Sequence, residues 1–520
     1  MNKVLKGLVA VAATAAMAVT GFAGASTAMA ADPTGGIQVA DGDTHTYSVY
    51  QILTGTYGAN GALGNVQAGT DFKVTNAAGD QGKDLTAAEA AEKLAKIGST
   101  ESDQTKLAEI LKFANLTTQY GSDLTASAPL TKVPAGYYLA KDKDNTVTGN
   151  DAQTLYIVKV VGNEDVTITR KADKPTLEKK VKDVNDSTGD KSGWQDSADY
   201  DVNDKVPFQL TATLPEDKDD FAAYKTYKLV FTDNQSAGLT YPDAIGFTVK
   251  YGETVVPASQ YTLTLNPTTT AADSTFTLTI NDVKSLKDAN GDAITVAEGG
   301  KFTVEYESTL NKNAVIGHDG NPNKAFLEFS NNPNYTGEGE NSPTGKTPED
   351  KVIVFTYQLN INKTFDQGAP AKDDMPKFKL YKKDYSTNQY NQVGTEITLT
   401  KGGTEEAPTY TGSFQRIDDG DYKLVESHTP AGYNTAADKL FTVTADHEVL
   451  SNDPKLLSLK IDQAKGDVTN GTVQADVVNK KGSNLPSTGG MGTVLLYVAG
   501  IAVFVLAGAT LVMALRRRNA

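Results

Sequence analysis

A lysine, an asparagine and a glutamate are predicted on the inner faces of strands near the C-terminal end of the chain. Successive side chains of a β-strand point to opposite faces of the sheet. Lys363 continues an alternating apolar series formed by Phe355, Tyr357, Leu359 and Ile361. Asn479 also ends such a series, and Glu426 ends another. The pattern therefore predicts an amine, a carboxamide and a carboxyl group inside one small unit.

Burial would change the chemistry of these three groups. Desolvation favours the neutral lysine and the protonated acid. A neutral amine is a nucleophile, and a protonated carboxyl group can polarise an amide carbonyl and shuttle protons. The product would be an isopeptide bond between Lys363 and Asn479, formed with loss of ammonia. Strand alternation alone does not exclude a buried ion pair beside a hydrogen-bonded amide, and by itself it favours that interpretation.

A second set of the same kind is predicted in the middle of the chain. Lys179 lies on the same strand face as the apolar residues Leu177 and Val181. It is therefore predicted to point inward, whereas the adjacent Lys180 points to the opposite face. Asp233 ends one alternating apolar series and Asn323 begins another. Glu305 has the opposite parity to its apolar neighbours, so Asp233 is the predicted acid.

The overall composition excludes several classes of function. The chain of 520 residues has no Cys, four scattered His and a formal net charge of -15. Thiol catalysis, disulfides and Cys-based zinc sites are excluded, and the acidic net charge disfavours nucleic-acid binding because it repels the phosphate backbone. No nucleophile elbow, metal-spaced His pair or phosphate loop is found. We therefore expect no enzyme and no cofactor, and we assign no metal ligand.

Both ends of the chain have the patterns of segments that lie outside a folded domain. Residues 1–30 combine early lysines, an apolar stretch and the ending Ala28-Met29-Ala30, which predicts a secretory signal peptide. Residues 494–515 are apolar and uncharged, long enough to cross a bilayer, and an Arg cluster that would stay cytoplasmic follows them. The peptide Leu485-Pro486-Ser487-Thr488-Gly489 stands before this run. We therefore assign residues 485–520 to a C-terminal sorting and anchoring segment.

Between these ends the sequence predicts three domains. Residues 31–171 mix strands with a helix that opens at a capping box, Thr86-Ala87-Ala88-Glu89, as in an α+β domain. Residues 172–345 contain many short strands separated by turn residues, which is typical of a β-sandwich. Residues 346–484 predict a second, smaller sandwich after a polar linker. The expected fold class is therefore mainly β.

The C-terminal motifs resemble those of sortase-assembled pilins of Gram-positive bacteria. The pentapeptide, apolar run and Arg tail together resemble a cell-wall sorting signal, and YKLVESHTPAGY around Glu426 resembles the pilin E-box. The whole chain resembles a major, or shaft, pilin, with an α+β pilin domain followed by immunoglobulin-like sandwiches of the collagen-adhesin A-type and then B-type. The resemblance implies two bond-forming sets, namely Lys179, Asp233 and Asn323 in the middle domain and Lys363, Glu426 and Asn479 in the last.

The resemblance also implies how subunits are joined. A pilus sortase would cleave between Thr488 and Gly489 and transfer the Thr488 acyl group to a lysine of the next subunit. The family's acceptor motif ends V-x-V-Y-P-K, and Val166–Lys171 stands at the matching place without the Tyr and Pro. Lys171 is thus the expected acceptor, and Lys174 is the alternative.

The expected partners follow from this resemblance. They are the pilus sortase, identical subunits in a covalent homopolymer, minor pilins, peptidoglycan and a host surface ligand of unknown kind. The expected location is a pilus on the wall of a Gram-positive bacterium. The alternative is a monomeric wall-anchored adhesin that binds a host ligand, because the same sorting signal and sandwiches would serve it.

Overall fold

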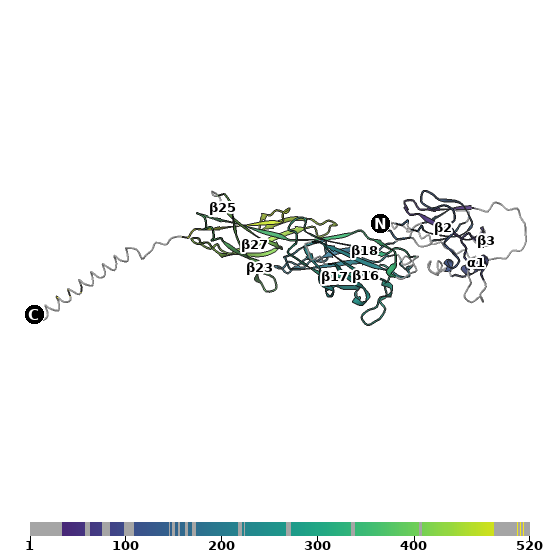
Figure 1. Cartoon of the computed structure of the whole chain (residues 1–520), viewed down its shortest axis with the longest axis horizontal. Coiled ribbons are helices and arrows are strands. Elements are labelled where there is room, and N and C mark those ends of the chain that lie inside the picture. The colour runs from purple at the N-terminus through teal and green to yellow at the C-terminus, as the bar shows by residue number, and fades with distance from the viewer. Residues whose placement is uncertain are drawn as a thin grey trace, which may run out of the picture.

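Three β-rich units follow one another along the long axis of the molecule (Figure 1). The computed structural model describes residues 34–482, apart from 58–62, 75–83, 98–108, 145, 148–150, 154–156, 162–164, 169–172, 217–220, 223, 267–271, 334–338 and 405–407, and it also describes residues 507, 510 and 513. The predicted signal peptide and the sorting pentapeptide lie outside the described residues. Among the described residues, no helix has the length and hydropathy needed to span a membrane.

The N-terminal unit combines two small sheets with one helix. Its strands are β1 (Thr34–Val39), β2 (Tyr47–Tyr57), β3 (Leu63–Ala68), β4 (Leu130–Pro134), β5 (Gly136–Asp142), β6 (Ile157–Val161) and β7 (Val166–Ile168). The sheet orders are β4-β1-β7 and β3-β2-β5-β6. Helix α1 (Ala87–Ala95) begins at the predicted capping box, because Thr86 and Glu89 each accept a hydrogen bond from the other's backbone N–H. Its buried Ala90 and Leu94 pack against the second sheet.

The middle unit is a sandwich of two sheets. Its strands are β8 (Thr176–Val181), β9 (Ser197–Asp199), β10 (Lys205–Thr213), β11 (Leu229–Gln235), β12 (Leu239–Thr240), β13 (Thr248–Tyr251), β14 (Thr254–Val255), β15 (Thr262–Asn266), β16 (Ser274–Ile280), β17 (Lys301–Leu310), β18 (Asn321–Ser330), β19 (Thr344–Lys346) and β20 (Asp350–Phe355). Short 3-10 turns are η1 (Ala244–Gly246), η2 (Ala258–Gln260), η3 (Val283–Ser285) and η4 (Gly339–Asn341). The sheet orders are β14-β13-β17-β10-β8, with β12 on β17, and β15-β16-β11-β18-β20-β9, with β19 on β18.

The C-terminal unit is a second sandwich. Its strands are β21 (Tyr357–Phe365), β22 (Lys377–Asp384), β23 (Gln389–Thr398), β24 (Thr400–Gly403), β25 (Pro408–Ile417), β26 (Gly420–His428), β27 (Lys439–His447), β28 (Leu456–Ile461), β29 (Ala464–Lys465) and β30 (Thr472–Asn479). The sheet orders are β24-β25-β21-β30 and β23-β22-β26-β27-β28-β29. The first and last strands, β21 and β30, are parallel neighbours, in register from Gln358 opposite Thr472 to Phe365 opposite Asn479.

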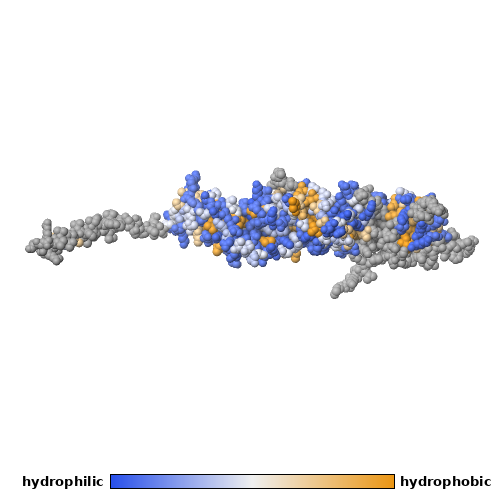
Figure 2. Space-filling model, turned by 90° about the horizontal axis from the view of Figure 1, so that it is seen from below, coloured by the Kyte–Doolittle hydropathy of each residue, from blue (hydrophilic) through white to orange (hydrophobic). Residues whose placement is uncertain are grey.

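Alternating side chains fill the two sandwich cores. Strand β17, for example, alternates between buried and less buried positions along its whole length, and β10 does the same. Apolar residues on the visible face of the described residues form only small groups on a mostly hydrophilic surface (Figure 2). The expected fold class, mainly β with two tandem sandwiches after an α+β unit, is confirmed.

Strand β20 belongs to a different sheet from the one implied by the predicted domain boundary. The sequence predicts that the last domain begins at residue 346, but β20 pairs with β18 and, in parallel, with β9 of the middle unit. The Asp350 carboxylate also accepts a hydrogen bond from the Lys179 backbone N–H at 2.6 Å. The backbone pairing favours a division near Thr356. The alternating apolar series begins at Phe355 in β20 and continues in phase through Tyr357, Leu359 and Ile361 of β21, so alternation could not show where the chain changes sheet.

Candidate crosslinking sites

Lys363, Glu426 and Asn479 come together inside the C-terminal sandwich, on β21, β26 and β30. Lys363 and Asn479 are fully buried, and Glu426 is 7% exposed. Lys363 Nζ donates a hydrogen bond to Asn479 Oδ1. Asn479 Nδ2 donates to Glu426 Oε1 at 2.8 Å, and Lys363 Nζ lies 3.7 Å from the same glutamate oxygen. The fold therefore brings the whole predicted set into contact.

Strand register explains how the three side chains meet. Asn479 lies opposite Phe365 in the parallel pair of β21 and β30, and Lys363 is two residues earlier on the same face. Glu426 comes from the other sheet, next to an irregularity in the pairing of β22 with β26. Its second oxygen, Oε2, accepts a hydrogen bond from the Ala436 backbone N–H at 2.8 Å, which orients Oε1 toward the amide of Asn479.

The electrostatics of this site favour a reactive amine. Burial lowers the pKa of Lys363 to about 8, although the nearby Glu426 carboxylate acts in the opposite direction. At such a pKa about one tenth of the amine is neutral at pH 7. Glu426 also lies within hydrogen-bonding distance of the amide nitrogen that would leave as ammonia. The arrangement can therefore supply both a nucleophile and a proton carrier.

Lys179, Asp233 and Asn323 are brought together in the middle sandwich. All three side chains are fully buried, and Lys179 Nζ lies 2.5 Å from Asp233 Oδ2. Burial lowers the pKa of Lys179, while the Asp233 carboxylate opposes this shift. Asn323 Oδ1 has no hydrogen-bond partner within the described part of the chain. Glu305 lies outside this cluster and instead accepts a hydrogen bond from Gln209 at 2.7 Å, as its parity predicts.

Tyr306 is a member of the middle site that was not predicted. Its hydroxyl accepts from Lys179 Nζ at 3.0 Å and from Asn323 Nδ2 at 2.9 Å. It donates to Asp233 Oδ1 at 3.0 Å. Burial raises the pKa of Tyr306 well above its usual range, so this hydroxyl keeps its proton. The available signal was the inward parity of Tyr306 on β17, because a buried tyrosine hydroxyl requires a polar partner.

A second tyrosine completes the donors around Asp233. Tyr241 donates its hydroxyl hydrogen bond to Asp233 Oδ1 at 2.8 Å. Asp233 thus faces two hydroxyl groups and one amine, and the lysine and asparagine of the set are linked through Tyr306. Sequence alternation found the three predicted members but not the hydroxyl that connects them.

The residues that we predict to link one subunit to the next can be located only in part. Lys171 and the sortase-motif residues Leu485, Pro486, Thr488 and Gly489 lie outside the described residues. Lys174, the alternative acceptor, is described. Its ammonium group pairs with the Asp151 carboxylate, and its side chain is 34% exposed.

Comparisons with known proteins match both the middle unit and the overall fold. Residues 202–333 match the family described as "Gram-positive pilin backbone subunit 2, Cna-B-like domain", and they form a domain of that family. The description is B-like, whereas the sequence resemblance favoured the A-type for this unit. The chain is also homologous to the trypsin-resistant surface T6 protein of Streptococcus pyogenes serotype M6, with 26% identity over 276 residues. That match covers 42% of this chain and 48% of the T6 protein, or about half of its length.

The fold is similar to that of one solved structure in particular. The T6 backbone pilin of serotype M6 Streptococcus pyogenes, described as a modular three-domain structure, aligns with a TM-score of 0.51 at 17% identity. The alignment covers 88% of this chain and 100% of that one. The full-length major pilin SpaD of Corynebacterium diphtheriae aligns with a TM-score of 0.44 at 14% identity, over 87% of this chain and 98% of that one.

Proposed function

We propose, starting from the pilin backbone domain at residues 202–333, that this chain is the structural subunit of a covalently polymerised pilus on the wall of a Gram-positive bacterium. The observation that carries the proposal is the pair of buried lysine–acid–asparagine sets, one in each of two successive sandwiches. Buried lysines with acid and amide partners have no evident use in a simple scaffold, because desolvating charged groups is costly. An internal crosslink in each sandwich accounts for both sets.

Each set would form one Lys–Asn isopeptide bond. The lysine Nζ attacks the Cγ atom of the asparagine, the bond from Cγ to Nδ2 breaks, and the nitrogen leaves as ammonia. Glu426 in one set and Asp233 in the other would carry the proton from the amine to the leaving nitrogen. The contact between Asn479 Nδ2 and Glu426 supports this role for Glu426.

Peptide mapping is expected to find both crosslinks. After proteolysis, the peptide that contains Lys363 should remain joined to the one that contains Asn479, at a mass about 17 Da below their sum, because the reaction expels one ammonia. The peptides of Lys179 and Asn323 should behave in the same way, for a total deficit of about 34 Da. Mass spectrometry of the digest makes the measurement. Recovery of four separate peptides at full mass would refute both bonds, and recovery of one free pair would refute that bond alone.

Polymerisation is expected to depend on Lys171. A pilus sortase would form an acyl-enzyme at Thr488, release Gly489 and the segment after it, and transfer Thr488 to the Lys171 amine of the next subunit. The ion pair of Lys174 with Asp151 supports this choice, because it occupies the alternative amine. Lys171→Ala should abolish the detergent-resistant ladder seen by blotting boiled wall extracts, while Lys174→Ala, the matched control, should retain it.

The same blot separates the proposal from its alternatives. A ladder that persists in Lys171→Ala and disappears in Lys174→Ala would move the acceptor to Lys174. A native strain with a single wall-linked band and no ladder would contradict the pilus subunit and agree with the monomeric adhesin.

A further inference from the structure

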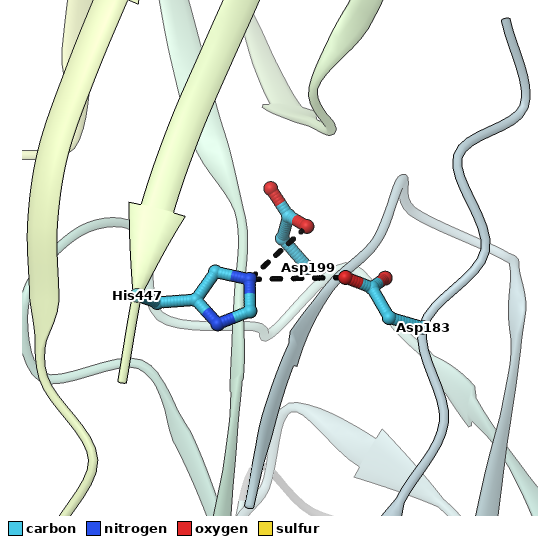
Figure 3. A group of neighbouring side chains, drawn as sticks. All are labelled: Asp183, Asp199 and His447. Carbon is cyan, nitrogen blue, oxygen red and sulfur yellow. Dashed lines mark ion pairs between the residues drawn. The ribbon is translucent and has the colours of Figure 1, made fainter. Parts of the chain in front are cut away.

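One histidine and two aspartates converge at the joint between the middle and C-terminal sandwiches (Figure 3). Asp183 follows β8, Asp199 ends β9, and His447 ends β27. His447 Nε2 lies 3.7 Å from Asp183 Oδ2 and 3.6 Å from Asp199 Oδ1. These separations are longer than a hydrogen bond. The three groups therefore face one another across a common space.

The other ring nitrogen of His447 determines what Nε2 presents to this space. A carbonyl oxygen can only accept a hydrogen bond, so the Ser197 hydroxyl donates to the Glu448 carbonyl at 2.7 Å. The Ser197 oxygen is then left to accept from His447 Nδ1, also at 2.7 Å. Nδ1 therefore carries a proton, and Nε2 is the ring nitrogen that faces the two carboxylates and can bind a metal ion once it is deprotonated.

Asp199 places a buried carboxylate oxygen in this space. Its side chain is 4% exposed, and its Oδ1 atom is the one that faces His447 Nε2. The buried hydroxyl of Tyr357 acts on the same carboxylate and lowers its pKa. A buried carboxylate is costly unless cations or hydrogen-bond donors surround it.

We propose that Asp183, Asp199 and His447 bind a divalent transition-metal ion of the zinc class, which joins the middle unit to the C-terminal unit. Zinc binds imidazole nitrogen and carboxylate oxygen at about 2.0–2.2 Å, so two of its tetrahedral ligands lie about 3.4 Å apart. The measured separations of 3.6 and 3.7 Å are close to this value. The hydrogen bond from Nδ1 to Ser197 holds the imidazole in the orientation that a metal ligand needs.

The donor atoms of the site select the class of metal ion. Asp199 offers an oxygen within 4.8 Å of oxygens of Asp418 and Asp419, and the Lys382 ammonium already pairs with Asp418 at 3.0 Å. The imidazole distinguishes the metal, because Ca²⁺ and Mg²⁺ prefer oxygen ligands while imidazole suits zinc-class ions. Two ligands come from the middle unit and one from the C-terminal unit, so the ion would connect the units directly.

Calorimetric titration of the full-length, EDTA-treated protein with zinc chloride tests the proposal. We expect one Zn²⁺ ion to bind per chain. The thermal unfolding midpoint should also rise, because free Zn²⁺ at 100 times Kd raises the ratio of folded to unfolded protein about 100-fold. Asp183→Asn should weaken binding by more than about 100-fold, since even loss of a residue that only orients a ligand costs about 10- to 100-fold. This variant should fold. The Oδ1 atom of residue 183 now accepts a hydrogen bond from the Val184 N–H at 2.9 Å, and an asparagine oxygen can accept the same bond. The new amide group can also donate a hydrogen bond to His447.

Two further variants make the test decisive. His447→Gln removes the ligand supplied by the other unit and should also abolish binding. His428→Gln is the matched control, because His428 lies in the same unit at the surface and contacts a single carboxylate, that of Asp374, at 2.6 Å; it should bind Zn²⁺ normally. Absence of Zn²⁺ binding, undiminished binding by Asp183→Asn or His447→Gln, or equal loss in His428→Gln would overturn the site. Binding of Ca²⁺ but not Zn²⁺ would also overturn it.

Discussion

Glu426→Gln is expected to leave Lys363 and Asn479 unlinked. The glutamine has nearly the same size and can still accept the hydrogen bond from Asn479, but it has no carboxyl proton to exchange. The variant should therefore regain about 17 Da, the mass of one ammonia. It should also lose about 5 kcal/mol of stability. This is the chain-entropy contribution of a crosslink between two residues that are 116 positions apart, as Lys363 and Asn479 are. Peptide mapping and thermal unfolding measure the two effects.

Two internal comparisons show whether this loss is specific. The linked peptide of Lys179 and Asn323 should persist in Glu426→Gln, because that set has its own acid. Glu396→Gln should change neither mass nor stability appreciably, since Glu396 is 37% exposed and its closest lysine nitrogen is 3.9 Å away. A Glu426→Gln protein that still contains the linked peptide would show that another group carries the proton.

Lys382→Met is expected to destabilise the joint between the sandwiches. Lys382 is 5% exposed, and its Nζ lies 2.8 Å from Asp201 Oδ2, 3.0 Å from Asp418 Oδ2 and 3.1 Å from Asp186 Oδ2. Burial lowers the pKa of Lys382, but these carboxylates and Tyr422 outweigh it and raise that pKa far above its usual value. Removing the cation leaves the buried carboxylates without a partner, which costs about 3–5 kcal/mol of stability.

The cost of losing Lys382 should depend on pH in a defined direction. Burial raises the pKa values of Asp201 and Asp418. A carboxyl group whose pKa is higher in the folded than in the unfolded protein binds more protons when folded, so stability falls as pH rises. Lys382→Met should therefore be less destabilising at pH 5 than at pH 8.

Urea unfolding at these two pH values makes the measurement, with Lys383→Met as the control. Lys383 is the next residue, 30% exposed, with its Nζ 3.6 Å from Asp421 Oδ2. A surface pair of this kind contributes about 0–1 kcal/mol. Equal urea midpoints for the two variants would contradict a stabilising role for Lys382.

Strand alternation predicted the buried members of both crosslinking sites, because the inward parity of Lys179 or Lys363 is a local property of the sequence. The same parity marks Lys382, which shares a buried face with Phe378 and Leu380 on β22. Its partners could not be predicted in this way, because they come from loops and strands of two units. His447 is a similar case, since it received no role from the sequence and gains neighbours only where the units meet.

The parallel pairing of β21 and β30 has a mechanical consequence. The chain enters the C-terminal sandwich at one end of β21 and leaves it at the opposite end of β30. In the proposed pilus, tension along the fibre would thus load the hydrogen bonds between these strands together, in shear, instead of opening them one after another. With the proposed bond in place, the load would pass from Asn479 directly to Lys363 and along residues 357–363. The remaining strands and loops of this sandwich would stay relaxed, so their sequences could vary without weakening the fibre.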